Sequence, residues 1–201
     1  MGEGKAMNRN EELPVLMFLN QEEARTIEAI ASRIIPSDET RPGAKEAGAV
    51  IYIDQSLAGY FRHLQTFYRQ GIIEFESFCR EKFGLAFKNL TEEQQDQLLL
   101  SIEKIEIVDI TDSSDDIEKR ENLLAQFFAV VHEHTMEGTF GDPLYGGNRD
   151  AVGWNLIGFP GAQWGYTPEQ MTLGFDVNQI KVKTLSDIQK EYKPVVTEVK
   201  L

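Results

Sequence analysis

The sequence predicts an all-α fold. Apolar residues recur every three to four positions over most of residues 20–136, two capping-box patterns mark helix starts, and Pro and Gly separate the segments. At 201 residues and 41% hydrophobic content, the chain can bury one core with extra segments outside it. We expect a flexible segment over residues 1–17 and an irregular helical domain over residues 18–136.

The first helix is expected to follow Asn20. Asn20 and Glu23 form a capping-box pattern, in which each side chain bonds to the backbone amide of the other residue. Ile27, Ile30 and Ile34 then recur on one face, and Pro36 ends the helix.

The longest apolar stripe follows a connection with two prolines and two glycines at residues 36–48. Its members keep helical spacing: Val50, Ile53, Leu57, Phe61, Leu64 and Phe67. Gly71 is the candidate point of interruption. A further helix is expected to end near Gly84, with the apolar residues Ile72, Phe75, Phe78 and Cys79. The phenylalanines around Cys79 favour a buried thiol that packs as a small apolar group.

Two more helices complete the predicted domain. The first begins at a Thr91–Gln94 capping box, with Leu90 as staple residue and an apolar face of Leu98, Leu99, Ile102 and Ile105. The second follows the acidic run 109–116, and its face comprises Ile117, Leu124, Phe127, Phe128 and Val131. The acidic run lacks the alternation and the glycine of a calcium loop, so a solvated loop with an Asp or Ser helix cap is expected.

Residues 137–175 have a different composition, because glycines there alternate with large aromatic residues and few charges intervene. So many glycines predict a series of turns, whereas a flexible linker would be poor in aromatics. Composition alone leaves two ways to cover the rings: the chain's own helices or another protein. A short helical turn is expected at 167–170, and residues 176–201 are expected to form an extended arm.

The net charge of −13 argues against nucleic acid and against an anionic membrane as partners. The sequence contains no run of about 20 apolar residues, so no membrane span is predicted. Residues 1–12 are polar and show no export-signal pattern. The sequence therefore leaves the compartment open. The chain is either cytoplasmic, or it is periplasmic or membrane-associated in a complex that it reaches through a trimmed signal or through a signal on its partner.

No catalytic, cofactor-binding or metal-binding residues are predicted. His132 and His134 lie two positions apart and point to different helix faces, whereas the zinc-binding H-E-x-x-H pattern places its histidines four apart. Cys79 has no histidine near it in the sequence, and the Gly146–Gly147 pair lacks the Lys and Ser or Thr of a phosphate-binding loop.

Five blocks between Phe18 and Pro168 carry a resemblance to a known family. They read FLNQEEARTIEAIASRIIPSD, PGAKEAGAVIYIDQSLAG, YRQGIIEFE, LTEEQQDQLL and EGTFGDPLYGGNRDAVGWNLIGFPG. In this order they resemble the gluconate 2-dehydrogenase subunit 3 family, the small subunits of flavin-dependent sugar and sugar-acid dehydrogenases. The family's twin-arginine signal is not found before Phe18.

The resemblance implies an accessory subunit rather than an enzyme. Its partner would be a large flavoprotein of the glucose-methanol-choline type that holds FAD and that the small subunit helps to mature, and a cytochrome c subunit is a further implied partner. Docking of the aromatic rings on the flavoprotein is then favoured over their burial against the chain's own helices, although part of the segment is expected to do both. The implied partner-binding residues are Phe140, Tyr145, Gly146, Gly147, Asn148, Trp154, Phe159, Pro160 and Trp164.

Two other functions compete with the subunit. A transient assembly chaperone would leave the finished flavoprotein, whereas a subunit would stay in an equimolar complex. An independent enzyme, the least favoured of the three, would show turnover or a bound chromophore in the isolated chain. The substrate, the electron acceptor and any bond from Cys79 to a partner are left open by the sequence.

Overall fold

The computed structural model describes residues 15–108 and 115–192, and this part of the chain is all-α, as predicted. Its α-helices are α1 (Gln21–Ile34), α2 (Ala44–Ala47), α3 (Ala49–Ala58), α4 (Gln65–Phe83), α5 (Glu92–Glu103), α6 (Asp116–Phe140), α7 (Val152–Ile157) and α8 (Leu185–Glu191). Short 3-10 helices join them: η1 (Arg62–Leu64), η2 (Phe87–Asn89), η3 (Pro143–Tyr145), η4 (Arg149–Ala151) and η5 (Val177–Gln179).

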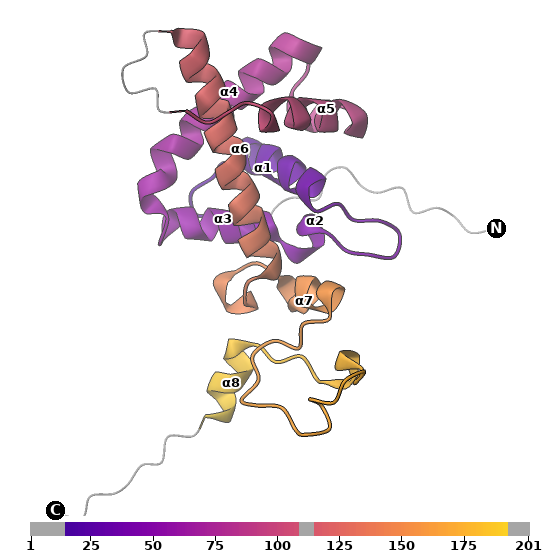
Figure 1. The fold of residues 1–201 in the computed structure, drawn as a ribbon. Coiled ribbons are helices and arrows are strands. Elements are labelled where there is room, and N and C mark those ends of the chain that lie inside the picture. The colour runs from indigo at the N-terminus through magenta and orange to yellow at the C-terminus, as the bar shows by residue number, and fades with distance from the viewer. Residues whose placement is uncertain (1–14, 109–114, 193–201) are drawn as a thin grey trace, which may run out of the picture.

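Helix α6 is the central element of the fold. It runs through the middle of the molecule with α1 to α5 around it, α7 beside its C-terminal end, and α8 beyond α7 (Figure 1). Leu124, Phe127 and Val131 of α6 are fully buried, and they pack with apolar residues of α1, α3, α4 and α5 in one core. The predicted stripe is thus confirmed at these positions, whereas Ile117 is exposed.

The predicted helix caps are confirmed. The capping boxes Asn20–Glu23 and Thr91–Gln94 are both formed, and α1 ends just before Pro36. Asp115 accepts bonds from two backbone amides in the first turn of α6, as expected for an Asp cap. The rest of the acidic run, residues 109–114, lies outside the described residues, as do residues 1–14 and 193–201.

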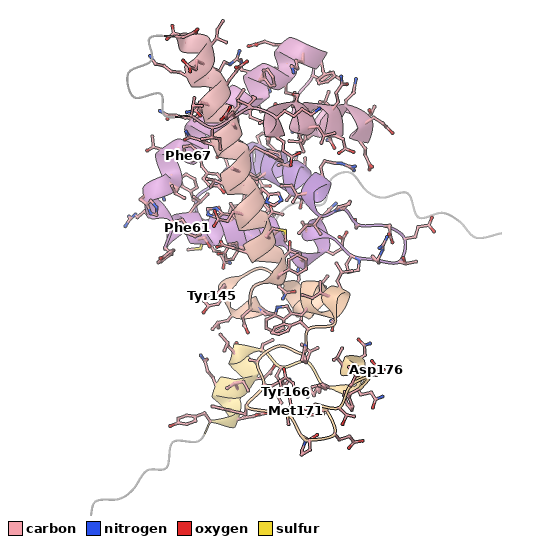
Figure 2. All side chains as sticks on the ribbon, in the orientation of Figure 1. Phe61, Phe67, Tyr145, Tyr166, Met171 and Asp176 are labelled. Atoms are coloured by element: carbon pink, nitrogen blue, oxygen red, sulfur yellow. The ribbon has the colours of Figure 1, made fainter. Side chains whose placement is uncertain are left out.

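The prediction of one long helix from Val50 to Phe67 is wrong. Helix α3 ends at Ala58, and the chain turns through Gly59, whose φ of −118° and ψ of −105° are not helical, before η1 and α4. Apolar spacing continues across this turn because α3 and α4 bury their faces against the same helix, α6. Phe61 lies in this turn and Phe67 in the first turn of α4 (Figure 2).

Gly71 does not interrupt a helix, contrary to expectation, because it lies within α4. A Cβ atom at this position would be 2.2 Å from Cδ2 of Phe127. The glycine is therefore the point where α4 and α6 approach closely, and the Phe127 ring occupies the space that a side chain would need. The predicted helix end at Gly84 is confirmed, since Gly84 caps α4 with a φ of 73°.

Three expectations for the C-terminal third need correction. Residues 137–140 belong to α6, so the helical domain does not end at 136, and α7 adds a helix within a segment predicted to consist of turns. The arm is not extended: the described part of residues 176–201 forms η5 and α8, and Ile180 is buried. A capping box between Thr184 and Asp187 begins α8, a pattern that the sequence analysis missed. The expected turn at 167–170 is present.

Candidate partner-binding surface

The YGGN turn is built around Asn148, which is fully buried. Its backbone amide donates to the carbonyl of Gly138 at 2.7 Å, and its Nδ2 donates to the carbonyl of Gly141 at 2.8 Å. Its Oδ1 accepts from the amide of Gly153 at 2.8 Å. With a φ of 43°, Asn148 adopts the left-handed conformation that Asn tolerates better than most residues. One side chain thus ties the end of α6, the turn and α7 together.

The neighbouring glycines allow close approach within the chain. A Cβ at Gly147 would lie 2.1 Å from the carbonyl oxygen of Gly138, and one at Gly153 would lie 1.9 Å from that of Thr139. Gly146 has a φ of 96°, and a Cβ there would meet Oε1 of Gln55 at 2.1 Å. These contacts show that the glycines are needed for the segment to pack on α3 and α6.

Trp154 belongs to the interior of the chain. It is 4% exposed, and its Nε1 donates to the carbonyl of Phe140 at 2.6 Å. The ring of Phe159 packs edge-on against it, with 5.1 Å between centroids, and a Cβ at Gly161 would be 2.6 Å from Cζ3 of the Trp154 ring. Trp154 and the half-buried Phe140 therefore hold α7 against α6. The ring of Trp154 is thus covered by the chain itself.

Other aromatic residues of the segment are exposed to solvent. Tyr145 is 56% exposed, Phe159 43% and Trp164 71%. Further apolar residues nearby in sequence are also exposed: Leu144, Ile157, Tyr166, Met171 and Leu173. We call these eight residues the C-terminal apolar surface. Tyr145 lies near the end of α6, whereas Tyr166 and Met171 lie in the part of the molecule beyond α7 (Figure 2).

Residues 158–192 pack mainly against one another and against η3. The carbonyl of Lys183 accepts from the amide of Ala162 at 2.7 Å, and the carbonyl of the half-buried Pro160 accepts from the amide of Lys183 at 3.1 Å. Oδ2 of Asp142 accepts from the amide of Leu185 at 2.8 Å, which joins the start of α8 to η3. These bonds position the loop that carries Trp164 and Tyr166.

The nine predicted partner-binding residues thus fall into two groups. Phe140, Gly146, Gly147, Asn148 and Trp154 pack within the chain, and Pro160 uses its carbonyl for an internal bond. Tyr145, Phe159 and Trp164 present large side chains to solvent. Five further exposed residues of this surface were not among the predicted ones, although apolar residues in a turn-forming stretch without helical spacing are a signal of exposure: Leu144, Ile157, Tyr166, Met171 and Leu173.

Two residues considered for chemistry are structural. His134 is buried, its Nδ1 lies 2.8 Å from the Tyr68 hydroxyl, and its ring stacks on Phe61 at 4.3 Å. Burial lowers the pKa of His134 below its ordinary value, although nearby glutamates act in the opposite direction. Cys79 is buried, as predicted, and burial raises the pKa of its thiol to about 11.

The described ranges contain no group of three His, Cys, Asp or Glu side chains placed to hold a metal ion. Within the same ranges, no helix has the length and apolar character needed to cross a membrane.

Comparison with known proteins identifies the family of the chain. Searches of curated proteins and of solved structures found no match. The model of one family, described as gluconate 2-dehydrogenase subunit 3, matches residues 21–161. The match extends from α1 through the YGGN turn and α7 to Gly161, so it includes both the helical core and the first part of the C-terminal apolar surface. The chain therefore belongs to the gluconate 2-dehydrogenase subunit 3 family.

Proposed function

We propose that this chain is the non-catalytic small subunit of an FAD-dependent sugar or sugar-acid dehydrogenase. Its partner is a large flavoprotein of the glucose-methanol-choline type, which the small subunit binds and helps to mature. Membership of a family named for a dehydrogenase subunit supports the proposal. The observation that carries it is the C-terminal apolar surface, which presents aromatic side chains to solvent within and just beyond the family-matched residues.

Exposed aromatic residues in such number favour a protein partner. Single exposed apolar residues are ordinary, but this many within one stretch of sequence indicate an interaction site, and Tyr and Trp are enriched among the residues that dominate binding energies. In an acidic chain of net charge −13, Tyr145, Phe159 and Trp164 lie in a stretch where few charges intervene. Depletion of charge is typical of the centre of an interface.

The division within the segment refines this proposal. Asn148, Trp154 and their glycine neighbours hold the loops in place, and the exposed Tyr145, Phe159 and Trp164 contact the flavoprotein. FAD and the catalytic residues belong to the large subunit, and a cytochrome c subunit is a further candidate member of the complex. Because docking loops here rest on a packed base, little ordering is needed when the complex forms, which favours affinity.

The proposal is tested by purifying the tagged full-length chain from its native source. We expect an equimolar partner with the absorbance spectrum of a flavin, and sugar-dependent reduction of an artificial electron acceptor by the complex. The variants Tyr145→Ala and Trp164→Ala should recover less flavoprotein than the wild type. Tyr60→Ala is the matched control, since Tyr60 is 86% exposed but lies at the α3–η1 turn. Circular dichroism of each variant establishes that it is folded.

Three results would count against the proposal. Recovery of the flavoprotein that is unchanged in both Tyr145→Ala and Trp164→Ala would remove the surface as its basis. A complex that dissociates once FAD is loaded would instead favour an assembly chaperone. Turnover or a bound chromophore in the isolated chain would make it an independent enzyme.

A further inference from the structure

A hollow of about 370 Å³ lies between the start of α3 and the η3–η4 turn. Gly48, Gly146 and Gly147 line it without side chains, whereas Arg149 and Asp150 contribute opposite charges. The guanidinium of Arg149 lies beside Gly48, since its Nη2 is 3.2 Å from where a Cβ of that glycine would be. Ile51 and Pro143 complete the lining, so the hollow combines open backbone and apolar side chains with one cationic and one anionic residue.

Arg149 has no ion pair within the described part of the chain, which is unusual in this protein. Six other described arginines are paired with carboxylates: Arg25, Arg33, Arg41, Arg69, Arg80 and Arg120. The chain has 33 acidic residues and 20 basic ones, so a carboxylate is easily found for an arginine. Arg149 is exposed and keeps its five N–H donors available for an external acceptor.

The turn around Arg149 is held in an unusual conformation. Asn148, Asp150 and Ala151 have φ values of 43°, 55° and 55°, in the left-handed region that residues with a Cβ seldom adopt. Asn148 anchors this turn to α6 and α7 through its buried hydrogen bonds. Arg149 therefore projects from a backbone that is fixed before any partner arrives, and such preorganisation favours binding.

We propose that this hollow receives one carboxylate side chain, from an Asp or Glu of the large subunit, and that Arg149 binds it through paired hydrogen bonds. This inference rests on the proposed function, because the partner is the same flavoprotein. Pro143 of η3 lines the hollow and directly precedes the exposed Leu144 and Tyr145, so the hollow lies close to this part of the C-terminal apolar surface. Arginine matches the planar geometry of a carboxylate, and it is enriched at protein interfaces.

Asp150 gives a second prediction, with an effect on binding opposite to that of Arg149. Asp150 also lines the hollow, so its negative charge is close enough to repel an incoming anion. The hollow thus favours a single carboxylate over a phosphate group, which carries more negative charge. Removing the Asp150 charge should strengthen binding, whereas removing the Arg149 charge should weaken it.

The test measures dissociation of the full-length chain from the purified flavoprotein with which it co-purifies. Arg149→Ala should raise the dissociation constant by about tenfold or more, mainly through faster dissociation. Arg149→Lys should recover little of this loss, because lysine lacks the planar fork. Asp150→Asn should bind several-fold more tightly, by about the effect of one partly screened charge, and Asn tolerates the left-handed φ at this position.

Arg62→Ala is the matched control. Arg62 is the other arginine of the described ranges without an ion pair, it is exposed, and it lies beyond the opposite end of α3 from Gly48. Equal dissociation of Arg149→Ala and Arg62→Ala would overturn the inference, as would weaker binding of Asp150→Asn. If these variants bind normally while Tyr145→Ala does not, only the role of Arg149 fails. If the wild type captures no flavoprotein, the proposed function fails with it.

Discussion

Replacing Gly71 by alanine should destabilise the protein, although the substitution is favourable for an isolated helix. Gly71 lies within α4 and faces Phe127 of α6. An added Cβ would be 2.2 Å from Cδ2, 2.5 Å from Cγ and 2.9 Å from Cε2 of that ring. Ordinary contacts between carbon atoms are about 3.5–4.0 Å, so the ring or the helix must move by about 1 Å or more.

The magnitude follows from two opposing terms. Alanine in place of glycine within a helix is worth about 1 kcal/mol. Overpacking a buried site costs about 1–3 kcal/mol, and occasionally more. Phe127 is fully buried and packs against the rings of Tyr68 and Phe75, so it has little freedom to move aside. We place the cost at the upper end and expect a net loss of about 1–2 kcal/mol, or roughly 2–8 °C in Tm.

Thermal and denaturant unfolding followed by circular dichroism measures this loss. Gly165→Ala is the control, since Gly165 has open space around its Cβ position and should change stability by less than about 0.5 kcal/mol. Combining Gly71→Ala with Phe127→Leu should destabilise the protein by less than the sum of the two single changes. A Tm of Gly71→Ala above that of the wild type would refute the argument.

Three further predictions concern buried polar groups. The Asp54 carboxylate accepts three hydrogen bonds from the backbone amides of residues 17–19. Asp54→Asn should therefore lower the unfolding free energy by about 1.5–3 kcal/mol and speed hydrogen exchange at Met17. Unchanged stability and exchange would refute this. Burial lowers the pKa of His134, so the unfolded state binds a proton at a higher pH than the folded state does. The free energy of unfolding should therefore fall as the pH drops below about 6.5, and it should fall less in His134→Gln. A pH dependence of the unfolding free energy that is the same in His134→Gln as in the wild type would contradict this role of His134. The thiol of Cys79, with its pKa raised to about 11, should react with a disulfide reagent at pH 8 only after denaturation; rapid reaction of the native protein would show that the thiol is accessible.

The YGGN turn has a consequence for mutational studies of this family member. Its glycines and Asn148 are occupied by contacts to α3, α6 and α7, so substitutions there should lower stability before they alter any surface. Partner binding is better tested at Tyr145, Trp164 and Arg149, whose side chains are exposed.

The local signals of the sequence were sufficient for the helical class and for those helix ends that carry a capping box, an Asp cap, a proline or a terminal glycine. Asn20 and Thr91 cap their helices through bonds to residues three positions away, so a short window contains all the information needed. The buried face of α6 was also predictable, because helical spacing alone places Leu124, Phe127 and Val131 on one side. The membership of the family likewise followed from short blocks of sequence.

Only the tertiary structure decided what each glycine and aromatic residue of the chain does. Gly59 turns the backbone after α3, whereas Gly71 lies within α4 against Phe127, a residue distant in sequence. Trp154 is buried and Trp164 is exposed, although both occur in the same glycine-rich segment. Burial is set by contacts between segments far apart in the chain, and neither composition nor spacing determines which ring the core will cover. The sequence by itself therefore determined the helical class and the family, whereas the fold determined which aromatic residues stay exposed.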